Sequence, residues 1–307
     1  MRRRHQACGS NKGGDGPLLK LMELSVVIVS YNVCDLLRQS MKSLISSTGE
    51  IDHEIIVVDN NSADHSAEMV EREFPGVMLI ASGTNEGYAA ACNRGIIASS
   101  GRFILILNPD TVVNPEAIPR AMTFMKTHHD AGAAGAHMTD GNGRFLPESK
   151  RGFPSPLTSL FKFIRLGRIF PRSAFFNAYY LGNKPEDQTC RADILTGAFM
   201  LIRREALDRA GLFDTSFFMY GEDIDLSWRI RKAGFYNYYL HDVHITHFKG
   251  KSSEQDRESS LRHFYDAMTI FAEKHLARAW HFPVKASVRL LGHLAMTRLH
   301  HGLRGKK

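Results

Sequence analysis

Long apolar runs and a secretory leader are missing from this sequence of 307 residues. No segment approaches the roughly eighteen uninterrupted apolar residues that a membrane-spanning helix requires. The first residues begin with Arg2, Arg3 and Arg4 and become rich in glycine, without the apolar stretch of a secretory signal. We therefore expect residues 1–22 to form a disordered basic tail with no catalytic role, and the protein to be cytoplasmic.

Cysteine motifs and the best-known nucleotide motifs are also missing. Only four cysteines are present, and no two have C-x-x-C spacing, which disfavours a zinc knuckle or a thiol redox site. Without a Walker A motif, or a G-x-G-x-x-G after the first strand, ATP hydrolysis and dinucleotide redox chemistry have weak support. The net charge of +7 favours anionic partners. No helix-turn-helix, RNA-recognition or zinc-finger pattern accompanies that charge, so nucleic acid is not an expected partner.

The first half of the chain contains strands that alternate with helices. Short apolar, β-branched runs indicate buried strands at 24–30, 54–58, 77–81 and 103–107. Helical spacing indicates helices between them, at 34–47, 63–73 and 86–99. This order predicts an α/β fold, with a doubly wound, mainly parallel sheet and helices on both faces. Such sheets bind ligands beyond the carboxyl ends of their strands, where we find Ser30, Tyr31, Asp59 and Asp110.

The second half is less regular. Prolines interrupt residues 141–191, which we interpret as a variable insertion with one helix near 157–164. Strands are predicted at 131–137, 194–202, 235–240 and 243–247, and a helix at 223–232. Residues 254–307 are basic and weakly amphipathic, and we expect them to form a helical extension.

Asp110 ends the run Asn108-Pro109-Asp110, directly after a buried strand. A carboxylate in that position costs free energy unless something uses it, and a divalent cation that bridges two phosphates is a natural use. Asn-Pro-Asp is also good turn chemistry. A cation or phosphate contact is favoured because a second acidic cluster exists.

That second cluster is Glu222, Asp223 and Asp225. Carboxylates this close raise one another's pKa, so one of them is a candidate base. Acidic residues also stabilise the start of a helix, and this role could account for one or two of the three. Asp225 and Arg229 are spaced as an i,i+4 ion pair, which makes Asp225 structural.

Other polar residues have competing interpretations. Asp59 can accept hydrogen bonds from a ribose or a base, but taken alone an Asx turn is favoured. The loop 84–87, with its glycines, suits a phosphate at a helix N-terminus or is a plain capped loop. Among His241, His244 and His247, the middle residue points away from the others on a strand. A three-histidine zinc site is therefore disfavoured, and His247 is preferred as a single metal ligand.

Two basic-aromatic segments, 161–172 and 275–304, could contact lipid headgroups or a polyanionic acceptor, but a solvated charged surface is the favoured interpretation. With all these residues in place, the chain strongly resembles family 2 inverting glycosyltransferases of the GT-A fold, and within them the rhamnosyltransferase-like branch. The resemblance covers about 24–253, in family order, through the strings LSVVIVSYN, EIIVVDNNS, TNEGYAAACNRGI, FILILNPDTVV, LTGAFMLIRREAL, FFMYGEDIDLSWRIRKAGF and HITHFKGKSS.

The resemblance implies roles for individual residues. A nucleotide-sugar pocket is implied for Ser30, Tyr31, Asp59, Asn85, Gly87, Asn93, Asn108 and Asp110. Asp110 stands at the last position of the family's D-x-D motif and holds a cation, whereas Asn108 replaces the first aspartate that many members carry. Asp223 stands at the base position with Glu222 beside it, and His247 matches a histidine that completes the metal site in some relatives.

The implied enzyme is an inverting glycosyltransferase, with residues 23–253 as its transferase domain. It moves rhamnose or another hexose from a nucleoside-diphosphate sugar to a saccharide or lipid-linked acceptor in cell-surface polysaccharide synthesis. A divalent cation, Mg²⁺ or Mn²⁺, is the expected cofactor, and a peripheral contact with the inner face of the plasma membrane is expected. The alternatives are a catalytically silent nucleotide-sugar-binding protein and a membrane-surface scaffold.

Overall fold

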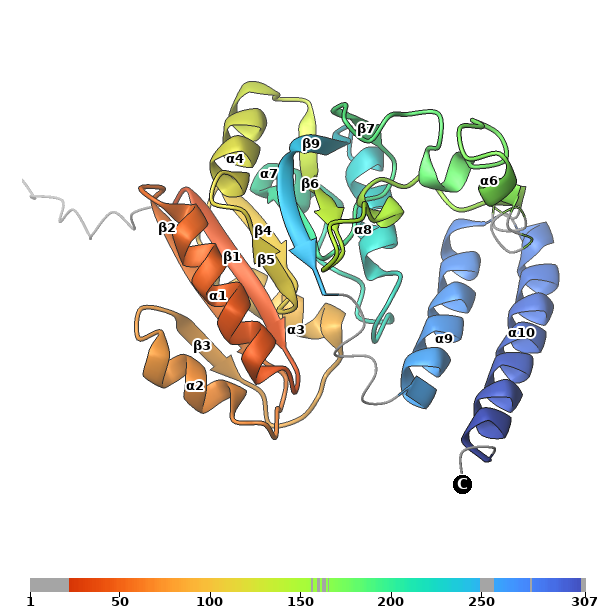
Figure 1. The fold of residues 1–307 in the computed structure, drawn as a ribbon, viewed down its shortest axis with the longest axis horizontal. Helices are drawn as coiled ribbons and strands as arrows, with labels where there is room; N and C mark the ends of the chain where they lie inside the picture. Colours follow the sequence, from red (N-terminus) through yellow and green to blue (C-terminus); the bar gives the residue numbers. More distant parts are fainter. Residues whose placement is uncertain are drawn as a thin grey trace, which may run out of the picture.

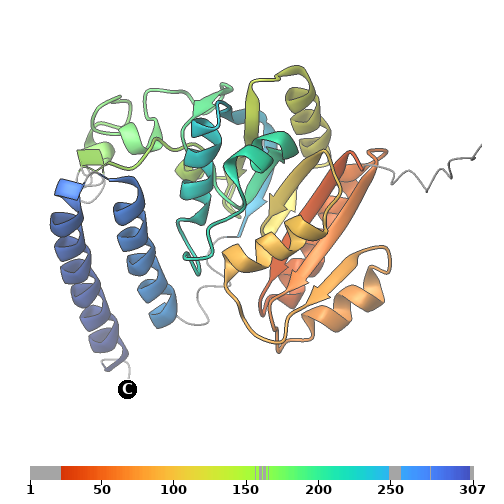
Figure 2. The same ribbon diagram turned by 180° about the vertical axis from the view of Figure 1, so that it is seen from behind.

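The computed structural model describes residues 22–155, 157, 158, 161, 164, 166–248, 257–276 and 278–304. Most of the expected tail 1–22 and part of the expected helix 157–164 lie outside these residues. A twisted sheet stands at the centre, helices cover both of its faces, and two long helices stand side by side at one flank (Figure 1, Figure 2). The strands are β1 (Leu24–Ser30), β2 (His53–Asp59), β3 (Met78–Ala81), β4 (Phe103–Leu107), β5 (Thr111–Val113), β6 (Ala131–Thr139), β7 (Cys190–Ala192), β8 (Phe199–Arg203) and β9 (Tyr236–His247).

The helices come from every part of the described chain. The α-helices are α1 (Cys34–Thr48), α2 (Ser66–Glu73), α3 (Tyr88–Ala98), α4 (Ala117–Thr127), α6 (Leu166–Ile169), α7 (Arg204–Ala210), α8 (Glu222–Lys232), α9 (Arg257–His275) and α10 (Arg278–Arg304). Two short 3-10 helices, η1 (Pro147–Ser149) and η2 (Ala178–Tyr180), lie in the predicted insertion.

Within the described residues the sheet has the strand order β3-β2-β1-β4-β8-β6-β9-β5, and β7 pairs with β9. Strands β3, β2, β1 and β4 are parallel to one another, and β6 is parallel to β9. Strand β8 runs antiparallel between β4 and β6, and β5 and β7 run antiparallel to β9. The prediction of an α/β fold with a mainly parallel sheet and helices on both faces is confirmed.

Alternate residues of β1 point to opposite faces of the sheet, and both faces are buried. Val26 and Ile28 pack with Leu37 of α1 on one face, whereas Val27 and Val29 pack with residues of α3, α7 and α8 on the other. Strands that are covered on both faces need apolar residues at every position. This is why β1, β2 and β4 were predicted correctly as continuous apolar runs.

Two strands differ from their predicted bounds. The run 194–202 contributes only its second part to β8, because Ile194 forms an isolated bridge with Arg151 and Leu195 donates its N–H to the Ser227 hydroxyl (3.2 Å). The two predicted strands at 235–240 and 243–247 are one strand, β9. Its pairing with β6 shifts register after Leu240, so the polar residues that suggested a break lie at an irregularity within a continuous strand.

The predicted helical extension is present as α9 and α10. Phe217, Ala267 and Phe271 form a small apolar cluster that packs α9 against the loop before α8. In the part of the chain that the structure describes, no helix is at once long and apolar enough to cross a membrane.

Candidate functional site

Ser30 and Asp59 lie side by side at the carboxyl ends of β1 and β2, as register partners. Asp59 Oδ2 accepts a hydrogen bond from the Ser62 N–H (2.9 Å), a local contact that spans three residues rather than the two of the Asx turn that the sequence suggested. Asp59 Oδ1 and Ser30 Oγ are buried and have no hydrogen-bond partner within the described structure. Buried polar atoms are usually paired, so these two atoms are available to a ligand. The neighbouring Tyr31 is 41% exposed.

Asn85 and Gly87 belong to a loop that side-chain hydrogen bonds hold in place. Asn85 Oδ1 accepts hydrogen bonds from Asn60 Nδ2 (2.8 Å) and from the Gly87 N–H (3.0 Å). Gly87 has φ +86°, and a Cβ there would stand 2.6 Å from the Phe218 carbonyl oxygen. Only glycine fits without strain, and the contact attaches this loop to the segment before α8.

Asn93, predicted to face the nucleotide sugar, uses its amide within the protein. Asn93 Nδ2 donates to the Phe213 carbonyl (2.8 Å), and Asn93 Oδ1 accepts from the Phe213 N–H (2.9 Å). The side chain is 9% exposed and joins α3 to the loop after α7. The structure thus gives Asn93 a structural role, and its contact with a ligand stays a prediction.

Asp110 and His247 are brought together by the pairing of β5 with β9, in which Thr111 is opposite His247. His247 Nε2 lies 3.1 Å from Asp110 Oδ1, and both side chains are nearly buried. Asp110 Oδ1 accepts no hydrogen bond from any described residue. A buried carboxylate oxygen without a donor, next to an imidazole nitrogen, fits a divalent cation.

Two protein ligands do not complete the coordination of a divalent cation. Among the described residues there is no group of three or more His, Cys, Asp or Glu side chains that could hold a metal ion. His241, His244 and His247 form no such group in the described part of the chain. A cation held by Asp110 and His247 would need further oxygen ligands from a substrate or water.

The three carboxylates at the start of α8 have different surroundings. Asp225 is fully buried, and its oxygens contact Arg229 Nε (2.7 Å), Lys274 Nζ (2.8 Å) and His275 Nε2 (2.8 Å). Burial alone would raise the pKa of Asp225, but hydrogen bonds from His275, Lys274 and Arg229 outweigh it and hold that pKa well below its usual range. The predicted ion pair with Arg229 is confirmed, and Asp225 fastens α9 to α8.

Glu222 is 6% exposed, and its Oε2 has no hydrogen-bond partner in the described chain. Burial raises the pKa of Glu222 to about 8, and the charge of Asp223 contributes in the same direction. At neutral pH this carboxyl group therefore carries a proton for most of the time.

Asp223 is held by Arg151, a residue that our sequence analysis did not single out. Arg151 Nη2 donates to Asp223 Oδ2 (2.6 Å) and to the Leu195 carbonyl (2.7 Å). Burial lowers the pKa of Arg151, but the charge of Asp223 reverses this and raises it overall. Arg151 lies in the predicted insertion 141–191, where no periodicity or motif marks it, and its main chain is fixed by hydrogen bonds with Ile194.

Tyr88 lies near both acidic clusters and was also missed. Its hydroxyl donates to Asn108 Oδ1 (2.9 Å). Burial raises the pKa of Tyr88 well above its usual value, and the charges of Cys92, Glu222 and Asp223 add to the effect. The hydroxyl is therefore close to both α8 and the end of β4. The sequence feature that could have identified Tyr88 is its position directly after Gly87, at the first residue of α3.

Comparisons with known proteins show the family to which the chain belongs. The model of the family Glycosyl transferase family 2 matches residues 25–211, a stretch that includes Asp110 and ends before Asp223. Over 285 residues the chain is 30% identical to N-acetylglucosaminyl-diphospho-decaprenol L-rhamnosyltransferase of Mycobacterium tuberculosis (strain ATCC 25618 / H37Rv). This match covers 89% of the chain and 91% of the relative.

Solved structures show the same fold. Mannosyltransferase PcManGT from Pyrobaculum calidifontis, in complex with GDP-Man and Mn2+, matches with a TM-score of 0.58 and 18% identity, over 93% of this chain and 81% of that one. S. aureus TarS 1-349, in complex with UDP-GlcNAc, matches with a TM-score of 0.56 and 20% identity, over 89% and 73%. At these identities the likeness concerns the fold alone.

Proposed function

The chain belongs to glycosyl transferase family 2, and from this premise we propose that it transfers rhamnose or a related hexose from a nucleoside-diphosphate sugar to a lipid-linked saccharide in cell-surface polysaccharide synthesis. It is a glycosyltransferase, and the proposal concerns its substrates and the residues that act on them. One observation supports it: Asp110, which pairs with His247, follows the carboxyl end of β4, where Asn108 accepts a hydrogen bond from the Tyr88 hydroxyl. The charge of Asp223, which pairs with Arg151, acts on that same hydroxyl.

The donor is proposed to lie across the ends of β1, β2 and β4. The free oxygens of Ser30 and Asp59 suit the N–H and O–H groups of a nucleoside, and the exposed Tyr31 offers a ring for the base. Asn85, Gly87, Asn93 and Asn108 shape the wall of this pocket. A divalent cation, Mg²⁺ or Mn²⁺, bound by Asp110 and His247 would offset the negative charge of the departing diphosphate.

Asp223 is proposed as the general base. Its carboxylate takes the proton of an acceptor hydroxyl, and that oxygen attacks the anomeric carbon from the face opposite the diphosphate. The bond from the anomeric carbon to the diphosphate oxygen breaks, and the nucleoside diphosphate leaves with the electron pair. Configuration inverts and no covalent intermediate forms. Arg151 fixes the orientation of Asp223, while the protonated Glu222 beside it adds no second negative charge.

The acceptor is proposed to be lipid-linked because the M. tuberculosis relative is named for a decaprenol-diphosphate acceptor. Residues 23–253 would form the transferase domain, and 254–307 an extension toward the acceptor. The enzyme would act in the cytoplasm, in peripheral contact with the inner face of the plasma membrane.

The test is a donor screen that measures released nucleoside diphosphate, followed by Asp223→Asn. We expect transfer to fall by at least about 100-fold, the usual contribution of a positioned base, while donor binding persists. Asp208→Asn, at an exposed position of α7, is the control and should transfer normally. Near-normal turnover in Asp223→Asn would remove Asp223 from this role.

A further inference from the structure

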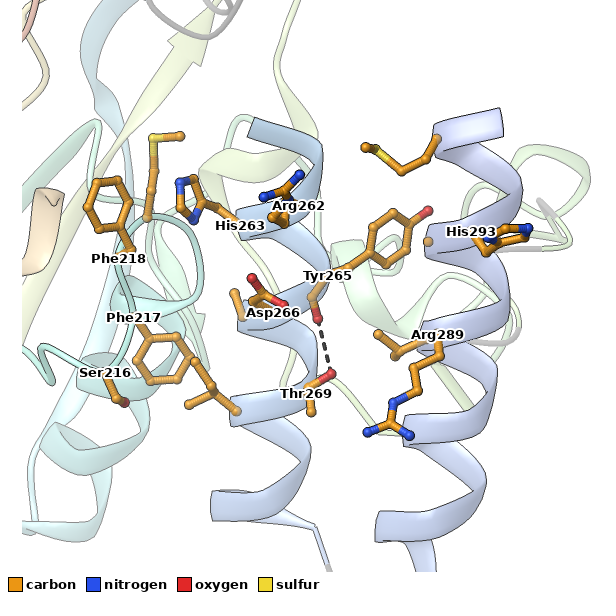
Figure 3. A pocket seen from close by; sticks show the side chains of 16 residues that line it. Ser216, Phe217, Phe218, Arg262, His263, Tyr265, Asp266, Thr269, Arg289 and His293 are labelled. Atoms are coloured by element: carbon orange, nitrogen blue, oxygen red, sulfur yellow. Dashed lines mark hydrogen bonds between the residues drawn. The ribbon is translucent and has the colours of Figure 1, made fainter. Parts of the chain in front are cut away.

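A cavity of about 650 Å³ lies beside α9 and α10, and the proposed reaction does not yet use it. It is an open cavity lined by the loop before α8, by α9 and by α10, and α9 stands between the loop and α10 (Figure 3). Ligand pockets commonly have volumes of roughly 300–1,000 Å³, so this one is large enough for a substrate group. Neither Asp110 nor Asp223 is among its lining residues.

The lining is basic and apolar at the same time. Arg262 and His263 of α9 and Arg289 and His293 of α10 contribute to the wall, against one acidic residue, Asp266 (Figure 3). Apolar contributions come from Phe217, Phe218, Met219, Ala267, Ile270, Val288 and Met296. Arg289 has no carboxylate partner among the described residues, and Arg262 has a long contact of 3.5 Å with Glu258.

The surroundings of the cavity have the same character. Residues 257–304 contain eight Lys and Arg against three Asp and Glu, so this helix pair carries most of the chain's net charge of +7. Large apolar side chains are exposed on the same two helices: Phe264 at 44%, Trp280 at 49% and Leu290 at 61%. An anion with a long apolar tail matches both features, whereas a free saccharide would need neither.

Phe218 places the cavity next to the reaction site. Its ring stacks on His263 of α9 (centroids 4.4 Å apart) and lines the cavity, while its carbonyl accepts the Tyr88 N–H (2.7 Å). The loop that carries Phe218 leads directly into Glu222 and Asp223. An acceptor seated in the cavity would therefore extend its sugar toward the proposed base.

We infer that this cavity holds the isoprenoid diphosphate of a lipid-linked acceptor, with the basic side chains of α9 and α10 toward the diphosphate and the apolar wall against the first isoprene units. The inference rests on the proposed function, since it assigns a place to that acceptor. The proposed occupant is the acceptor lipid itself. Binding of these helices to a bilayer surface alone would overturn the inference.

The first experiment measures calorimetric binding of farnesyl diphosphate, without donor, to the full-length protein. We expect binding that inorganic pyrophosphate and farnesol each match only weakly. The double variant Arg262→Ala/Arg289→Ala should lower the affinity at least about tenfold, because it removes two charge-assisted contacts. Arg257→Ala, an exposed arginine on α9 outside the cavity, is the matched control and should bind like the unmodified protein.

The second experiment measures steady-state transfer. The double variant should raise the KM for a lipid-linked acceptor much more than the KM for the donor. If no sugar is transferred at all, the proposed function fails, while farnesyl diphosphate binding still tests the cavity. If transfer occurs with unchanged KM in the double variant, the cavity assignment alone fails.

Two further outcomes decide the matter if the double variant does not fold. A diazirine-bearing farnesyl diphosphate should label peptides of α9 or α10 in the unmodified protein, and labelling elsewhere would overturn the inference. Sedimentation with anionic vesicles, without any binding of farnesyl diphosphate, would also overturn it, because the helices would then contact only a membrane surface.

Discussion

Arg151 and Asp223 form an ion pair in which the two side chains are only 10% and 14% exposed. Removing the cation leaves a nearly buried carboxylate without its partner, and such losses cost about 3–5 kcal/mol. We expect Arg151→Ala to lower the free energy of unfolding by about 3 kcal/mol in urea titrations, and to abolish transfer. The control is Arg191→Ala, which breaks the more exposed pair with Asp130 and should cost less than about 1 kcal/mol. Equal losses in the two variants would contradict the assigned role of Arg151.

Glu222 gives the protein a pH-dependent stability. Its carboxyl group keeps a proton up to about pH 8 in the folded state, but only up to its ordinary pKa of 4.5 in the unfolded chain. That stabilising contribution is complete below pH 4.5 and is lost as the pH rises toward 8, by up to ~1.4 kcal/mol per pH unit. Glu222→Gln should remove this slope, which unfolding titrations at several pH values between 5 and 8 would measure. Parallel curves for the two proteins would show that Glu222 is ionised in the fold.

Single residues were predictable where they belong to a motif or where their burial costs free energy. Asp110 stands at the end of a buried strand, and Asp223 stands in an acidic cluster, so both could be selected from sequence. Arg151 could not, because its importance comes from a contact 72 positions away along the chain. Asn93 shows the opposite error. It lies within a recognisable motif, which suggested a contact with the ligand, but its amide forms hydrogen bonds with the main chain of Phe213.

At the scale of elements, one buried carboxylate joins helices that are distant in sequence. Asp225 of α8 contacts Lys274 and His275 at the end of α9 as well as Arg229. Asp225→Asn leaves three cationic or polar groups without their anion, and we expect a loss of about 3 kcal/mol of stability. Hydrogen exchange should become faster across α9 in this variant. Asp35→Asn, at a carboxylate that is 96% exposed, is the control, and exchange unchanged in both would argue against the attachment.

Strands and helices with a strong hydrophobic pattern of their own were predicted from sequence. Strands whose bounds depend on pairing with distant parts of the chain were not. The apolar runs of β1, β2 and β4 have to be strands because both of their faces are covered. The short β8 was predicted too long, since 194–198 are as apolar as a strand but find their hydrogen bonds elsewhere. The continuity of β9 depends on an irregular pairing with β6 that no sequence pattern shows.

At the scale of the whole molecule, the proposed cation site depends on strands that meet only in the folded sheet. We expect Mn²⁺ to strengthen the binding of a nucleoside diphosphate, and Asp110→Asn to reduce that gain at least about tenfold. Calorimetry with UDP, GDP and TDP, with and without Mn²⁺, would measure it. Asp242→Asn, on the same strand as His247, should keep the full gain. A gain of equal size in Asp110→Asn would place the cation elsewhere.

The contact between Gly87 and Phe218 has a kinetic consequence. Gly87 belongs to the loop that we propose for the donor side, and Phe218 forms part of the cavity wall proposed for the acceptor, so one backbone contact would border both substrates. Any displacement of the loop by the first substrate must move the wall that meets the second. The two substrates should therefore bind with synergy and in a compulsory order, and a ternary complex should precede every turnover.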